Sequence, residues 1–131
     1  MPPIRWLSLD SVLMLQELQI QEFGGATGIR DRAMLESALA RPQNKEAFGE
    51  TRISALAAAY CYGFVRNHAF IDGNKRIGLV VAAVFLEMNG LILQAPEDDA
   101  TATILSLSAG SLTEEALTTW FERHSAPLGD R

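Results

Sequence analysis

Apolar residues recur at helical spacing along most of the chain. Spacings of i, i+3, i+4 and i+7 are typical of amphipathic helices that turn one face toward a core. Between these runs lie glycines, prolines and short polar stretches. The predicted helices cover about residues 12–23, 31–41, 51–67, 73–87, 96–110 and 111–124, with a brief extended piece at 91–93. The pattern therefore predicts an all-α fold of about six helices, with at most one short hairpin.

Capping residues and helix breakers set the first boundaries. Ser8–Ser11 offers N-caps for the first helix, and Gly24–Gly25 ends it. Asp31 is a good cap for the second helix. Pro42 is expected to end that helix, because proline lacks the backbone N–H that a helix interior needs. The polar stretch 41–50 is therefore predicted to be an exposed loop.

Similar signals mark the later part of the chain. Thr51 is a candidate cap for the third helix. Ser111 and Glu114 have the spacing of a capping box for the last helix. The segment 125–131 lacks helical periodicity, and we expect a loose tail. The length of 131 residues is that of one domain, 1–131, with a core of its own.

The most apolar stretch is 77–86, ten residues without a charge. A helix that is apolar all round is one that others surround. We therefore predict that the helix over 73–87 is the central buried helix. The run is too short to span a membrane, which takes roughly 20 residues.

Composition excludes several classes of protein. The chain is 48% hydrophobic and 21% charged, and its net charge of −5 argues against direct nucleic-acid binding. A single cysteine, Cys61, excludes an internal disulfide and a multi-cysteine zinc site. Neither a P-loop nor a dinucleotide-binding fingerprint is present. The first residues do not resemble a secretory signal, so we expect a cytoplasmic protein with no membrane contact.

Directly before the apolar run lies a polar cluster, His68–Arg76. Lys75 and Arg76 fall in the first helical turn, where cations cost roughly 0.3–1 kcal/mol each against the helix dipole. Gly73 lets the backbone approach a ligand closely. A bound anion would resolve the conflict, and phosphate is the obvious candidate. The alternative is that both cations merely extend into solvent.

The other members of the cluster each allow two interpretations. With phosphate bound, Asp72 would hold Mg²⁺, although an aspartate here can also be a plain N-cap. His68 can accept a proton near neutral pH, or it can be a structural histidine. Asn74 can cap the helix or bind a phosphate oxygen. Phe70 is predicted to anchor the loop in the core, whereas His124 is a plain surface residue.

The nine residues His68-Ala-Phe-Ile-Asp-Gly-Asn-Lys-Arg76 resemble the signature of the Fic/Doc family, H-x-F-x-(D/E)-(G/A)-N-(G/K)-R. With Lys75 the motif resembles that of the Doc (death-on-curing) branch, since AMP-transferring Fic enzymes usually have glycine at this position. The likeness extends over roughly residues 4 to 124. It is clearest at Gly28–Asp31, Leu35–Gln43 and Phe85–Gly90. The resemblance implies the all-α Fic/Doc (Fido) fold.

The same resemblance implies a function. Doc proteins are toxins of toxin–antitoxin pairs, and the best-known member transfers phosphate from ATP to a threonine of elongation factor Tu. By this likeness His68 is the general base and Asp72 the Mg²⁺ ligand. The implied phosphate ligands are Gly73, Asn74, Lys75 and Arg76. The stretch 41–50 would be the flap that docks the target as an added strand, and an antitoxin would fold a disordered segment onto the toxin.

Three departures from the family pattern matter. Leu79 stands where AMP-transferring Fic proteins have a second arginine, which weakens the AMP-transfer interpretation. Gly73 is the Fic-like choice where Doc prototypes have alanine. Ser111 and Glu115 faintly resemble a self-inhibitory Fic motif, S-x-x-x-E-(G/N), but Ala116 breaks it, so we expect no built-in inhibitor. Two alternatives to a kinase toxin stay open: a protein adenylyltransferase, and a catalytically idle domain that binds an antitoxin.

Overall fold

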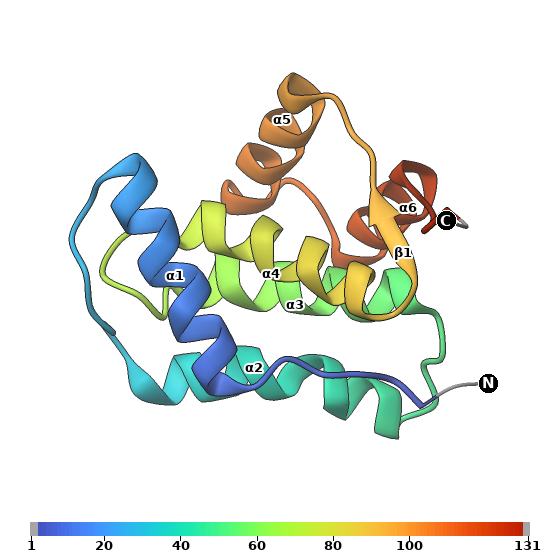
Figure 1. The fold of residues 1–131 in the computed structure, drawn as a ribbon, viewed down its shortest axis with the longest axis horizontal. Coiled ribbons are helices and arrows are strands. Elements are labelled where there is room, and N and C mark those ends of the chain that lie inside the picture. Colours follow the sequence, from blue (N-terminus) through green and yellow to red (C-terminus); the bar gives the residue numbers. More distant parts are fainter. Residues whose placement is uncertain (1–2, 130–131) are drawn as a thin grey trace.

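The computed structural model describes residues 3–129, and within them it contains six helices and two short strands (Figure 1). This confirms the predicted all-α fold. The helices are α1 (Leu9–Phe23), α2 (Arg32–Ala47), α3 (Ile53–Asn67), α4 (Asn74–Met88), α5 (Glu97–Ser108) and α6 (Glu114–His124). The strands are β1 (Leu91–Leu93) and β2 (Ser125–Pro127). No helix in the described part of the chain is long and apolar enough to cross a membrane.

The early caps form as predicted. Ser8 Oγ accepts a hydrogen bond from the Ser11 N–H at 3.1 Å, and Asp31 Oδ1 accepts one from the Met34 N–H at 3.1 Å. Each bond satisfies a backbone donor that the first helical turn leaves free. Gly24 ends α1 with a φ of +82°, which glycine adopts without steric cost.

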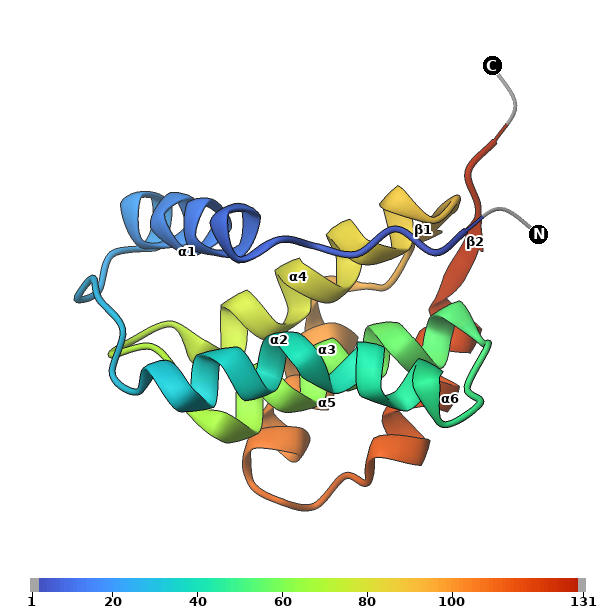
Figure 2. The ribbon, with the colours of Figure 1, turned by 90° about the horizontal axis from the view of Figure 1, so that it is seen from below.

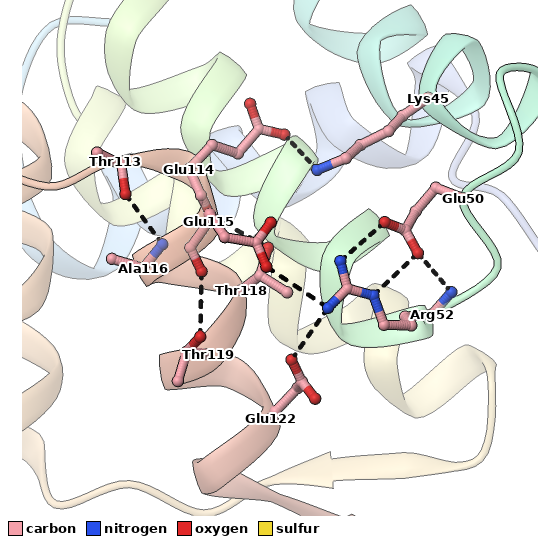
Figure 3. Close-up of polar contacts among 10 residues, drawn as sticks. All are labelled: Lys45, Glu50, Arg52, Thr113, Glu114, Glu115, Ala116, Thr118, Thr119 and Glu122. Atoms are coloured by element: carbon pink, nitrogen blue, oxygen red, sulfur yellow. Dashed lines mark hydrogen bonds and ion pairs between the residues drawn. The ribbon is translucent and has the colours of Figure 1, made fainter.

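The two later caps were predicted wrongly. Arg52, not Thr51, is the N-cap residue of α3, and Glu50 Oε2 accepts from its N–H at 3.0 Å. Thr113, not Ser111, caps α6, and its Oγ1 accepts from the Ala116 N–H at 3.0 Å (Figure 3). Both helices begin later than predicted: α3 begins at Ile53 and α6 at Glu114.

The most buried helix is α3, whereas the sequence predicts this place for the helix over 73–87. Ten of its residues are buried, and α2, α4 and α6 pack against it. Small side chains allow this close packing: a Cβ on Gly78 of α4 would lie 2.6 Å from Val65 Cγ2 of α3. In α4, one face is buried, whereas Leu79 and Val80 are partly exposed. An uncharged sequence does not show which of its faces a neighbour will cover.

Helix α2 continues through Pro42, which the sequence analysis expected to end it. The predicted loop over 41–50 is therefore helical as far as Ala47, and no strand lies there. A proline inside a helix costs about 3 kcal/mol. Pro42 is buried, so apolar packing offsets part of this cost. Ion pairs from Arg41 and Lys45 to Glu114 of α6 hold the second half of α2 in place.

An ion-pair network joins the α2–α3 connection to α6 (Figure 3). Arg52 lies 3.0 Å from Glu50 and 3.5 Å from Glu122. Hydrogen bonds from the Arg52 side chain and backbone lower the pKa of Glu50 to about 2. Burial alone would raise the pKa of Glu114, but hydrogen bonds from Arg41 and Lys45 shift it downward. These contacts hold the polar α2–α3 connection against α6.

The small sheet pairs β1 with β2 in antiparallel register, with Ile92 opposite Ala126. The extended piece at 91–93 is thus confirmed. A loose tail was expected from residue 125, but Ser125–Pro127 form β2 instead. The edge of β1 supplies the partners that a short isolated strand lacks. The two strands are far apart in sequence, so the sheet is not the expected hairpin.

Different connections lie at the two ends of the α2–α3 helix pair. In both views the α2–α3 connection lies at one end, and the loops over 24–31 and 68–73 lie at the other (Figures 1 and 2). Because the predicted cluster is in the second loop, the stretch 41–50 ends far from it. A flap at 41–50 is therefore not supported.

Candidate functional site

The predicted cluster forms the turn that joins α3 to α4. His68 ends α3 in the left-handed region, with φ 50° and ψ 49°, and it is the one non-glycine residue of positive φ among residues 3–129. Such a backbone costs a residue with a Cβ about 1 kcal/mol or more. The side chain of His68 is exposed. A strained, exposed histidine at a helix end is a reasonable candidate for chemistry.

Backbone bonds fasten this turn to the loop after α1. The Arg30 N–H donates to the Ala69 carbonyl at 2.8 Å, and the Ile71 N–H donates to the Gly28 carbonyl at 3.0 Å. The Arg30 side chain also donates from Nε to the His68 carbonyl at 2.6 Å. This cation satisfies carbonyls at the negative end of α3. The loop over 24–31 therefore fixes the backbone of His68.

Phe70 and Asn74 give the turn its shape. Phe70 is 1% exposed and stacks on Phe64 with 6.4 Å between ring centroids. Asn74 Oδ1 accepts from the Phe70 N–H at 3.0 Å, and Asn74 Nδ2 donates to the Phe70 carbonyl at 2.9 Å. Both ends of the Asn74 amide are thus used inside the turn. Asn74 can still offer a ligand its backbone N–H and the second N–H of Nδ2.

Asp72 lies one residue before Gly73, the N-cap of α4, so it is not the plain cap that the sequence allowed. Its Oδ1 accepts from the Gly73 N–H at 2.8 Å, and its Oδ2 lies 3.4 Å from the Ala26 N. Each carboxylate oxygen keeps a lone pair. Within residues 3–129 no three His, Cys, Asp or Glu side chains gather for a metal. Asp72 fits Mg²⁺, which takes one or two carboxylates together with phosphate oxygens and water.

The start of α4 has the features of an anion site. Gly73 makes no side-chain cap, and the first backbone bond inside the helix joins Ile77 N–H to the Gly73 carbonyl. The N–H groups of Asn74, Lys75 and Arg76 precede that bond, and such groups bind anions well. Lys75 is exposed and makes no ion pair in the described part of the chain.

Arg76 already has protein partners. Its guanidinium donates to the Gly24 carbonyl at 3.2 Å and lies 5.1 Å from the ring centroid of Phe23. The end of α1 is negative, so it accounts for this cation without an anion. The dipole conflict predicted from sequence therefore rests on Lys75. Arg76 has further N–H groups left for a ligand.

A cavity of about 200 Å³ extends from this helix start toward α5. It is lined by Lys75, Arg76, Leu79, Ala100, Thr101, Ile104 and Leu105. Beyond the two cations its walls are apolar except for Thr101. Leu79 therefore gives the cavity a hydrophobic wall at the position discussed above for a second arginine.

Sequence reasoning missed three residues that hold the site. Arg30 and Gly25 act from the loop after α1, and only the fold brings them to the turn. Gln16 of α1 is 5% exposed and donates to the Asp72 carbonyl at 2.8 Å. A signal for Gln16 was present, because it is the polar member of the buried stripe Val12, Gln16 and Ile20.

Known proteins resemble this chain over a region that includes the candidate site. The model of the Fic/DOC family matches residues 6–86, which include His68–Arg76. A relative named protein kinase doc, from Escherichia phage P1, is 31% identical over 114 residues, 86% of each chain. A relative named toxin Doc, from Mycolicibacterium smegmatis, is 42% identical over 79 residues, which are 58% of this chain and 60% of the relative.

Proposed function

Because this chain belongs to the Fic/DOC family, we propose that it is a Doc-type toxin that transfers phosphate from ATP to a protein hydroxyl. The target we propose is elongation factor Tu, so that the reaction stops protein synthesis. The observation that carries the proposal is the turn His68–Arg76. It puts a histidine, a carboxylate and a free helix N-terminus at one end of the bundle. One similar protein also bears the name of a kinase.

In the proposed reaction, the target hydroxyl attacks the γ-phosphorus of ATP. A bond forms between the hydroxyl oxygen and that phosphorus, the bond to the β-phosphate oxygen breaks, and ADP leaves. His68 accepts the hydroxyl proton. Phosphate oxygens are bound by the backbone at Gly73 and by the backbone and side chains of Asn74, Lys75 and Arg76, and Asp72 would hold the metal. Mg²⁺ bound there would neutralise developing charge, which is the main requirement of phosphoryl transfer.

Phosphate transfer is favoured over AMP transfer by two residues. Lys75 adds a mobile cation where AMP-transferring relatives have glycine. Leu79 lies on the wall of the cavity beside Lys75 and Arg76 and offers no phosphate ligand. A protein adenylyltransferase remains the second candidate, since the two reactions differ only in which phosphorus faces His68.

For target docking we propose the segment 24–31 in place of 41–50. It is exposed apart from Ile29 and Asp31, is rich in glycine, and bonds to the turn that carries His68. An extended target segment that pairs with free backbone groups here would bring its hydroxyl to the site. We further propose that the toxin acts in the cytoplasm. There, a separate antitoxin would inhibit it by folding a disordered segment onto it.

The decisive experiment uses purified protein, elongation factor Tu and ATP labelled on either the α or the γ phosphate. We expect γ label on the target, ADP as product, and transfer by His68→Asn that is about 10²- to 10⁴-fold slower. Label from the α phosphate would establish the adenylyltransferase instead. If the parent labels no protein, and His68→Asn stops growth as well as the parent does, the protein is not an enzyme of this kind.

A further inference from the structure

Gln16 is a buried polar residue on an otherwise apolar stripe of α1. It lies between Val12 and Ile20 on the buried stripe of α1, and it is 5% exposed. Its Oε1 is buried and has no hydrogen-bond partner in the described part of the chain. A buried acceptor without a partner costs about 1–3 kcal/mol. An apolar residue would fill the stripe without that cost, so packing within the stripe does not explain Gln16.

The amide of Gln16 lies against the peptide that joins Asp72 to Gly73. Gln16 Nε2 donates to the Asp72 carbonyl at 2.8 Å. A Cβ on Gly73 would lie 3.4 Å from Gln16 Nε2 and 3.7 Å from Oε1. The contact is therefore made at the point where the loop becomes α4.

This hydrogen bond sets the direction of a second one. In a trans peptide the C=O and the following N–H point to opposite sides. Since the Asp72 carbonyl points to Gln16, the Gly73 N–H points away from α1, where it donates to Asp72 Oδ1 at 2.8 Å. Gly73 has a φ of +77°, and glycine there permits the peptide to turn over at little steric cost. Gln16 opposes that rotation.

We propose that Gln16 is a positioning residue for the phosphate-transfer site. It locks the Asp72–Gly73 peptide, and thereby holds the Asp72 carboxylate and the first N–H groups of α4 in the arrangement that binds metal and phosphate. The inference rests on the proposed function, because it assigns a role within the same site. Such a positioning residue can be recognised by substitution. An apolar replacement of Gln16 should keep the stability of the fold but lower the rate of phosphate transfer.

The test compares Gln16→Met with the same substitution at a partly exposed glutamine of the same helix, Gln19→Met. Met is similar to Gln in length and helix propensity. For Gln16→Met we expect an unchanged or higher melting temperature, and amide exchange at Gly73 at least about 10-fold faster. We also expect Mn²⁺ with ADP, followed by electron paramagnetic resonance, to bind about 10- to 100-fold more weakly, and kcat to fall by a similar factor. Gln19→Met should leave all four readouts unchanged.

Other results separate the possible failures. Parent-like Gly73 exchange and Mn²⁺ binding in Gln16→Met would overturn the positioning role. If Gln16→Met does not fold, Gln16→Asn, whose amide is too short to reach, takes its place. Exchange at Gly73 that rises only in step with global unfolding would then make the role structural and overturn the proposal. If the parent transfers no phosphate, the proposed function fails, but Gly73 exchange and Mn²⁺ binding still decide the role of Gln16.

Discussion

The carboxylate of Asp72 lies directly against Gly25: a Cβ on that glycine would sit 2.7 Å from Asp72 Oδ2. Gly25 has a φ of +117°, and its neighbour Gly24 has a φ of +82°. A Cβ on Gly24 would meet nothing within 4 Å. Both glycines thus have a positive φ, but only Gly25 also leaves room for the Asp72 carboxylate.

This pair permits a matched experiment. Gly24→Ala and Gly25→Ala should each destabilise the fold by about 1 kcal/mol or more, because both put a Cβ on a backbone of positive φ. Only Gly25→Ala should displace the Asp72 carboxylate. We therefore expect phosphate transfer and Mn²⁺ binding to fall by about 10-fold or more in Gly25→Ala alone. Equal activity of the two variants, at equal melting temperature, would show that the contact does not matter.

His68 can be tested without disturbing the turn. Asn tolerates the left-handed backbone better than most residues, so His68→Asn should keep φ near 50° and the bond from Arg30 to the carbonyl. The imidazole is exposed, and its loss should leave the melting temperature nearly unchanged. Without a proton acceptor, transfer should fall by about 10²- to 10⁴-fold. Growth inhibition by His68→Asn equal to that of the parent would remove catalysis as its cause.

How far the sequence leads depends on how local the relevant interactions are. Periodicity and caps such as Asp31 act within a few residues, and the six helices follow from them. The turn His68–Arg76 is contiguous, so its members were predicted to lie together. Even the burial of Phe70 can be inferred, because Phe70 alternates with the polar residues His68 and Asp72.

Other features depend on surfaces that meet only in the fold. Pro42 stays inside α2 because α3 and α6 hold that helix, which no local rule shows. The flap that the family resemblance implied at 41–50 needed a loop there, and this stretch is helical as far as Ala47. Gly25 meets Asp72 across two loops, and Arg76 finds Gly24 across two helices. For the same reason, Arg76 was predicted to lack a partner at the start of α4, although the end of α1 supplies one.

The closest packing of α3 on α4 predicts a strong effect on stability. A Cβ on Gly78 would lie 2.6 Å from Val65 Cγ2 and 3.2 Å from the Cys61 carbonyl. Gly78→Ala should therefore lower the free energy of unfolding by about 1–3 kcal/mol, measured by urea denaturation. Val65→Ala removes the nearest obstacle. The double variant should be more stable than the sum of the two single effects predicts, and strict additivity would contradict the packing argument.

The ion-pair network at the far end of the bundle predicts a dependence of stability on pH. The pKa of Glu50 is about 2 in the folded protein, below the ordinary value of 4.5. A depressed carboxyl pKa stabilises the fold above the unfolded pKa, and the contribution disappears as pH falls from about 4.5 to about 2. Glu50→Gln should therefore lower the melting temperature at neutral pH but not near pH 2.

A control for this experiment is Glu46→Gln, since Glu46 is exposed and makes no ion pair within residues 3–129. Its melting curve should follow the parent at every pH. High salt should reduce the effect of Glu50→Gln, because Arg52 is partly exposed and its charge is screened. Phosphate transfer should be unchanged in Glu50→Gln, because the network lies at the α2–α3 connection and His68 ends α3. The α2–α3 connection and the α3–α4 loop lie at opposite ends of these helices (Figure 2). A selective loss of transfer in the folded variant would mean that this end of the bundle takes part in the reaction, as a flap at 41–50 would require.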